Sequence, residues 1–194
     1  MKAQKILMIC GDFSEDYEVA IPFHALKMLG YEVNAGCPDR DASSTVATCI
    51  HDINDKYQTV TEWEGHRFNL NISLNNVESD DYCALILPGG RACEYLRNYP
   101  VVKSLTSHFI KKKKPVAAIC RGTQILMATG LMKGRTLTGN SCVEAEVLLG
   151  GATYLKKSFE EVVVDGNIVT ATEWHGTYRW LQAFVELLGA KISI

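Results

Sequence analysis

Residues 115–126 read PVAAICRGTQIL, and this stretch decides the fold. Its apolar residues 116–119 form a short run that is typical of a strand buried on both faces of a sheet. Cys120 ends the run, and Gly122 allows a tight turn as a helix begins. A strand, a sharp turn and a helix in this order form a nucleophile elbow, which presents its side chain at the carboxyl edge of the sheet. We therefore predict an elbow with Cys120 at its tip.

The first 36 residues predict a strand, a helix and a second strand. Residues 5–12 combine an apolar run with a turn signal, which indicates a central strand. Pro22 is expected to begin the helix and Gly30 to end it. Residues 31–35 are expected to form the next strand, closed by Gly36. Such a unit is right-handed and implies a parallel sheet.

Between residues 44 and 76 the pattern changes to short polar-apolar alternation, which predicts a hairpin insertion with its turn at Glu64-Gly65. The remaining expected elements are a strand at 84–87, a helix running to about Lys113, a helix over 122–129, a helix from about Ser141, a hairpin over 162–170 and a final helix over 177–188. The whole predicts an α/β protein with a single domain over residues 1–194. It is expected to be a three-layer sandwich with a mostly parallel, doubly wound, flavodoxin-like sheet, a nucleophile elbow and a small β-hairpin insertion.

Composition limits the class of partner. The chain has 194 residues, 47% of them apolar, and 20 basic against 22 acidic residues give a net charge of -2. So small a charge favours a small-molecule partner over nucleic acid or membrane. No apolar run reaches the roughly 20 residues that span a bilayer, and the amino terminus lacks a signal-peptide pattern, so a cytoplasmic protein is expected.

The cysteines and histidines predict neither disulfides nor metal. Seven cysteines form an odd set without a C-x-x-C pair, and the five histidines are scattered without metal-ligand spacing. We expect reduced thiols, no metal and no cofactor.

Cys120 and Arg121 are the first two candidate catalytic residues. A thiol at a helix amino terminus has its pKa lowered, so Cys120 is expected to be mostly thiolate and the most reactive of the seven thiols. The alternative is a buried structural cysteine. Arg121 would stabilise the thiolate but cannot act as a general base, and its alternative is a side chain that points into solvent.

The same sheet edge is expected to hold a carboxyl group and an oxyanion site. Glu18 lies in an acidic turn after the first strand, where it could hydrogen-bond to the thiol and carry its proton, or simply cap a helix. Gly89 and Gly90 could offer backbone N–H groups to an oxyanion, together with the N–H of Arg121, or form a plain turn.

Four motifs carry a resemblance that runs over essentially the whole chain: EVAIP at 18–22, LPGGR at 87–91, AICRG at 118–122 followed by QIL at 124–126, and DGNIVT at 165–170. With these motifs the chain resembles the ThiJ/PfpI family, also called the DJ-one family, of the class I glutamine amidotransferase-like fold. It is most similar to the PfpI-like branch that includes plant glyoxalase III proteins. The resemblance implies that Cys120 is the nucleophile and Glu18 its carboxyl partner. It also implies that Gly89, Gly90 and Arg91 belong to the binding site and that the protein is a homo-oligomer, a dimer or larger.

Two positions depart from that branch. Arg121 stands where the branch usually has histidine, and His175 precedes Gly176 where the branch commonly has a histidine after the glycine. His175 therefore remains a candidate base. Peptidase chemistry is weakened most, because the leaving amine needs a proton donor.

The preferred function is cysteine-dependent conversion of a small aldehyde, methylglyoxal, to lactate without glutathione, or a deglycase-like reaction. The alternatives are a redox-sensing or stress-protective protein in which Cys120 is oxidised, an intracellular PfpI-like peptidase or amidase, and a catalytically silent oligomeric binding module.

Overall fold

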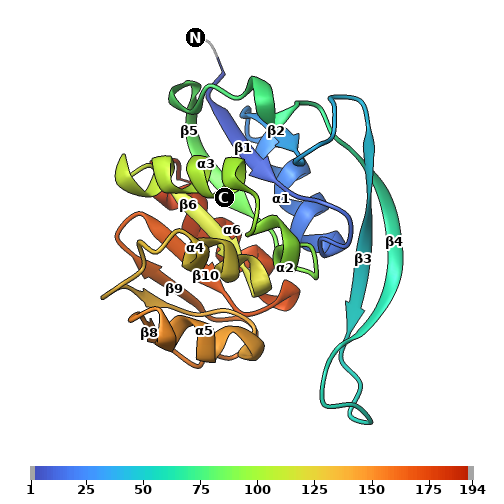
Figure 1. The fold of residues 1–194 in the computed structure, drawn as a ribbon, viewed down its shortest axis with the longest axis vertical. Coiled ribbons are helices and arrows are strands. Elements are labelled where there is room, and N and C mark those ends of the chain that lie inside the picture. Colours follow the sequence, from blue (N-terminus) through green and yellow to red (C-terminus); the bar gives the residue numbers. More distant parts are fainter. Residues whose placement is uncertain (1–2, 192–194) are drawn as a thin grey trace.

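A six-stranded sheet forms the centre of the computed structural model, which describes residues 3–191 (Figure 1). Its strands lie in the order β2-β1-β5-β6-β10-β9, and only β9 runs antiparallel to its neighbour. The strands are β1 (Lys5–Ile9), β2 (Glu32–Gly36), β5 (Tyr82–Leu87), β6 (Val116–Ile119), β9 (Val162–Asp165) and β10 (Ile168–Ala171). Strands β1, β5 and β6 are almost entirely apolar and buried, as parallel strands covered on both faces must be.

Helices cover both faces of this sheet. Helix α1 (Asp16–Met28) contacts α6 (Thr177–Leu187), and α6 packs on β6 and β10 through the fully buried Trp180 and Phe184. The other layer is a chain of mutually contacting helices: α2 (Cys93–Leu96), α3 (Pro100–Lys111), α4 (Thr123–Ala128) and α5 (Glu144–Leu149). The predicted three-layer α/β sandwich with a mostly parallel sheet is confirmed.

The hairpin insertion is present, but its predicted turn was wrong. Strands β3 (Thr45–Asp52) and β4 (Thr61–Asn69) form a separate antiparallel pair that lies as a long arm beside α1 (Figure 1). Gly65 lies within β4, and residues 53–60 make the connection. A Cβ at Gly65 would lie 2.6 Å from Thr48 Oγ1 and 3.2 Å from Asp16 Oδ1. This glycine therefore permits the arm to approach α1, and it does not make a turn.

Helix α1 begins six residues before the expected start at Pro22. The Glu15 carboxylate accepts a hydrogen bond from the Glu18 N–H at 2.9 Å and so caps the helix at its true beginning. Pro22 lies inside the helix, where it deprives the Glu18 carbonyl of its usual i+4 donor. The early start is what brings Glu18 into the first turn of the helix, close to the sheet edge.

The chain after β5 also differs in detail from the prediction. The single helix expected up to Lys113 is divided into α2 and α3, because Pro100 begins a new helix. A short parallel pair, β7 (Thr136–Leu137) with β8 (Thr153–Tyr154), was not foreseen. The hairpin of β9 and β10 and the final helix are confirmed. Within residues 3–191, no helix combines the length and apolarity that a membrane crossing requires.

Candidate active site

Cys120 lies at a strained turn directly after β6. Its φ of 57° falls in the left-handed region, which a residue other than glycine occupies at a cost of about 1–2 kcal/mol. The side chain is only 2% exposed. A Cβ at Gly122 would overlap the carbonyl oxygen of Leu87 in the neighbouring strand β5. Both features are those of the predicted nucleophile elbow.

The loops after β1 and β5 meet beside this cysteine. The loop after β1 crosses the loop after β5 through a bridge between Ser14 and Gly90 and a hydrogen bond of 3.3 Å from the Glu15 N–H to the Gly89 carbonyl. A Cβ at Gly89 would lie 2.6 Å from the Cβ of Cys120 and 2.7 Å from Glu18 Oε2. Gly89 must therefore be glycine for the thiol and the carboxyl group to face each other across it.

Glu18 is a fully buried carboxyl group with one free oxygen. Its Oε2 accepts a hydrogen bond of 2.7 Å from the Gly89 N–H, whereas its Oε1 is buried without a hydrogen-bond partner. Burial, followed by the charge of Glu15, raises the pKa of Glu18 well above its usual range. Burial therefore favours the protonated form of Glu18.

Two further carboxyl groups belong to the site, although the sequence analysis gave neither of them a role there. Glu15 is buried next to Glu18, and burial raises its pKa to about 7. Glu173 follows β10, and its Oε1 accepts a hydrogen bond of 2.7 Å from Asn140 Nδ2. Burial also raises the pKa of Glu173. Because these residues come from separate loops, only the fold brings them together.

The expected thiolate at Cys120 is not supported. Burial, followed by the charges of Glu18 and Glu173, raises the pKa of Cys120 well above its usual range, while the Gly90 N–H and Arg121 oppose this in part. The helix terminus is outweighed because the thiol is almost fully enclosed. Protonation of Glu18 removes one of the two negative charges that disfavour the thiolate. Ionisation of Cys120 therefore depends on the protonation state of Glu18.

Arg121 does not point into solvent. Its guanidinium forms an ion pair of 3.0 Å with Glu94 Oε1, lies against the Cys142 thiol, and leaves only 17% of the side chain exposed. The positive charge lowers the pKa of Glu18 and of Cys120, though less than burial raises them. Glu94 comes from α2, and no local sequence signal pairs it with Arg121.

Of the three predicted binding residues, Gly89 and Gly90 contact Glu18 and Cys120, whereas Arg91 contacts the hairpin arm. The Gly89 N–H is already bound by Glu18, so it is not free for an oxyanion, whereas the Gly90 N–H is directed at the Cys120 thiol. Arg91 is held by Glu62 of β4, with Nη2 to Oε1 at 2.7 Å, and stacks on Phe13 at 4.5 Å.

His175 is not brought to Cys120. It is exposed and stacks on Phe159 at 5.1 Å and on Trp174 at 4.5 Å between ring centroids. Within residues 3–191, no hydrogen bond joins any histidine to Cys120. Glu18, in contrast, lies against Gly89 together with Cys120.

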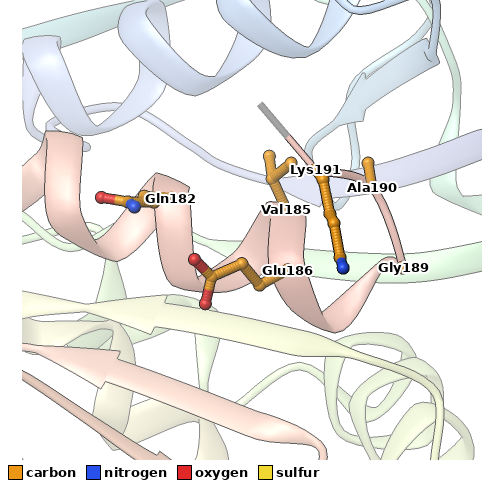
Figure 2. A pocket seen from close by; sticks show the side chains of 6 residues that line it. All are labelled: Gln182, Val185, Glu186, Gly189, Ala190 and Lys191. Carbon is orange, nitrogen blue, oxygen red and sulfur yellow. The ribbon is translucent and has the colours of Figure 1, made fainter. Parts of the chain in front are cut away.

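A cavity of about 480 Å³ opens beside the elbow. Arg121, Asn140, Cys142 and Glu173 line its inner side, and the hairpin connection, with Phe159, lines the rest. A second cavity lies at the end of α6, as Figure 2 shows. It is lined by Gln182, Val185, Glu186, Gly189, Ala190 and Lys191, none of which comes from the loops around Cys120.

The model of the DJ-1/PfpI family matches residues 4–187 of this chain. Protein DJ-1 homolog D of Arabidopsis thaliana is 41% identical over 191 residues, which are 98% of this chain and 49% of that protein. A Thermococcus kodakarensis protein named a deglycase is 33% identical over 184 residues, which are 95% of this chain and 99% of that protein. The chain thus spans about half the length of its plant relatives.

Solved structures show the same fold. Schizosaccharomyces pombe DJ-1 superposes with a TM-score of 0.79 at 21% identity, covering 96% of this chain and 93% of that one. Drosophila melanogaster DJ-1beta also gives 0.79 at 21% identity, covering 97% and 92%. The matched family model and the identity to relatives covered over their full length show that the chain belongs to the DJ-1/PfpI family.

Proposed function

We propose that this chain is a cysteine-dependent enzyme that converts methylglyoxal, a small 2-oxoaldehyde, to lactate without glutathione. The observation that carries the proposal is Glu18, a buried carboxyl group fixed by the Gly89 N–H, with a second oxygen that has no partner. Such a group can give and take one proton beside the Cys120 sulfur. Relatives named deglycases support aldehyde-directed chemistry, and removal of the same aldehyde from amine adducts is the related activity we expect.

Each step conserves the proton that the thiol brings. The Cys120 sulfur adds to the aldehyde carbon, and the thiol proton passes through Glu18 to the new alkoxide oxygen, giving a hemithioacetal. Glu18 then takes the proton of that carbon while the keto oxygen is protonated, giving an enediol, and returns it to the former keto carbon as the first hydroxyl group gives up its proton, which leaves a lactyl thioester. Water cleaves the thioester, releasing lactate and restoring the thiol.

The surroundings of Cys120 favour a small substrate over a peptide. The thiol is almost fully buried, and the cavity that Arg121 and Glu173 line has a volume of about 480 Å³. A peptide bond also needs a proton donor for its amine, and His175 does not reach the thiol. Asn140, which lines the cavity, is suited to hold the keto oxygen of the substrate.

A redox-sensing role for Cys120 is the rival proposal, but the thiol environment favours it less. Oxidation by peroxide begins from the thiolate, and burial raises the pKa of this thiol. Mass spectrometry after mild peroxide treatment tests the rival directly. Selective conversion of Cys120 to a sulfinate, without any turnover of methylglyoxal, would favour the sensor.

The central test is a lactate assay with methylglyoxal in the absence of glutathione. Cys120→Ser should abolish turnover, and Glu18→Gln should lower kcat by about 100- to 10,000-fold, because the amide cannot carry the proton. Thr106→Ala removes a buried hydroxyl group from α3, and it serves as the control for effects on folding. Full turnover by Cys120→Ser would refute the proposal.

Arg121→His provides a second, independent test. Histidine beside Cys120, oriented by Glu94, would add general acid-base help, so we expect turnover to rise by up to about 100-fold. Adding Glu94→Gln should remove most of that gain. A fall in turnover for Arg121→His, with the fold unchanged, would mean that the guanidinium itself holds the substrate.

A further inference from the structure

The hairpin arm brings a thiol, an imidazole and a carboxylate together on one face. Cys49 and His51 are two residues apart on β3, so strand alternation places both side chains on the same side. Glu62 on β4 is the direct cross-strand partner of His51. The three residues therefore converge because of strand register.

The distances within this cluster are close to those between ligands of one zinc ion. Cys49 Sγ lies 3.4 Å and Glu62 Oε2 lies 3.0 Å from the same atom, His51 Nε2, and all three ligand atoms lie within 4.8 Å of one another. In a tetrahedral zinc site, bonds of about 2.3 Å to sulfur and about 2.0–2.1 Å to nitrogen and oxygen separate neighbouring ligands by about 3.4–3.6 Å. The cluster needs little movement to admit the ion.

We propose that Cys49, His51 and Glu62 bind a zinc ion through three protein ligands. A catalytic relay would use both nitrogens of the histidine, one towards the nucleophile and one towards the carboxylate. Here both partners face Nε2, which suits a shared ion and not a relay. The sequence did not predict this site because cross-strand pairing produces neither a C-x-x-C pair nor regular histidine spacing.

The protein largely encloses the three ligand side chains. Cys49 is fully buried and His51 nearly so, while the Glu62 side chain is 24% exposed. Because zinc binds the thiolate, zinc binding would release the Cys49 thiol proton to solvent.

A contact from Arg91 orients Glu62, and a cavity leaves the fourth coordination position of the ion open. Arg91 holds Glu62 through Oε1 at 2.7 Å, which leaves Oε2 facing His51. A cavity of about 320 Å³ reaches His51 and is lined also by Glu15 and Trp174. A water molecule or a small anionic ligand can therefore take the fourth position.

The test measures metal binding by the full chain, independently of turnover. Protein dialysed against buffered zinc is analysed for metal content, and Co²⁺ replaces zinc so that a thiolate-to-cobalt absorption band reports on sulfur ligation. We expect one ion per chain and a clear band. Cys49→Ala should abolish the band and weaken affinity by at least about 100-fold, since even outer contacts cost about 10- to 100-fold. Glu62→Gln, a milder change, should weaken affinity by about 10-fold or more.

Two matched variants separate this site from the other thiols. Cys37→Ala removes another buried thiol, and Cys120→Ala removes the proposed nucleophile; both should keep full zinc binding. The proposal is overturned if wild-type protein retains no stoichiometric zinc. It is also overturned if Cys49→Ala keeps the wild-type affinity and the cobalt band.

Discussion

Two buried carboxyl groups, those of Glu18 and Glu173, act on the buried Cys120 thiol, and a third, that of Glu15, acts on Glu18. Burial raises the pKa of every one of these four groups, because charged forms lose hydration there. Burial therefore favours the protonated form of each group. A substrate that accepts a proton as the sulfur adds to it gains from that arrangement, which is the residue-scale reason for the proposed aldehyde chemistry.

Glu15 should make the protein less stable as pH rises. Its folded pKa of about 7 lies above its usual value of 4.5, so its stabilising contribution is complete below about pH 4.5 and is lost as pH rises to about 7. Glu15→Gln keeps an oxygen for the helix cap and cannot ionise. Urea unfolding should find the variant close to wild type at pH 4.5 and more stable by up to about 3 kcal/mol at pH 8.

Asp16 supplies the control with the opposite sign. Although its burial alone would raise the pKa, hydrogen bonds from Thr48 and His66 lower it. Asp16→Asn should therefore lose stability relative to wild type above the pKa of the carboxyl group. Identical pH profiles for Glu15→Gln and wild type would contradict the buried, proton-binding assignment of Glu15.

Cys142, and not Cys120, should be the first thiol to react with alkylating reagents. Of the seven cysteines, only Cys142 is exposed, and the Arg121 guanidinium beside it opposes the rise in its pKa that burial causes. We expect iodoacetamide to label Cys142 at least about 10-fold faster than Cys120, as measured by peptide mapping. In Cys142→Ser the remaining thiols should label slowly. Faster labelling of Cys120 in the wild type would restore the sequence-based expectation.

These residues show how much of the candidate site could be predicted from the sequence. Cys120 and Glu18 could be found because each stands at a recognisable turn after a strand. The direction of the Cys120 pKa could not, because it depends on how completely Glu18, Glu173 and the glycine loop enclose the sulfur. Glu94 was missed for a similar reason, since only tertiary packing brings α2 against Arg121.

At the scale of elements, the elbow depends on close contact between β5 and the start of α4. Gly122 has ordinary helical dihedral angles, so its substitution costs nothing in backbone strain, but an added Cβ would overlap the Leu87 carbonyl. Gly122→Ala should cost about 1–3 kcal/mol in urea unfolding and should also lower turnover, because the elbow must move.

Gly130→Ala is the matched control for this prediction. Gly130 has a φ of 69° with nothing within 4 Å of an added Cβ, so the substitution adds backbone strain of about 1–2 kcal/mol without a clash. Turnover should stay unchanged. Equal losses of turnover in both variants would show that stability alone, and not the position of the elbow, limits activity.

The sequence misplaced the start of α1 and the turn of the hairpin because both predictions rested on local signals alone. Pro22 and Gly65 are helix-start and turn signals by local rules, yet Pro22 lies inside α1 and Gly65 lies inside β4. At Gly65 the deciding contact is with Thr48 and Asp16, residues distant in sequence. Local signals placed the buried strands β1, β5 and β6 well, because their apolar character follows from the sheet itself.

At the scale of the whole molecule, α1 leaves an apolar stripe uncovered. Tyr17, Ile21 and Met28 are exposed, Met28 by 79%, and their spacing of four and seven residues places them on one face of the helix. The opposite face carries the buried Val19, Phe23 and Leu26. A helix with apolar side chains on both faces is expected to pack on both, which favours a second copy of the chain as the partner of the stripe.

The homo-oligomer is therefore the last prediction, and it places the contact on α1. Light scattering at micromolar concentration should report at least twice the chain mass of 21.5 kDa. Ile21→Lys should reduce the particle to a single chain, because an unpaired ammonium group would be desolvated in the contact. Leu149→Lys, at an exposed apolar position on α5, is the matched control and should leave the mass unchanged. A wild-type particle of one chain mass would refute the oligomer, and dissociation by Leu149→Lys alone would move the contact to α5.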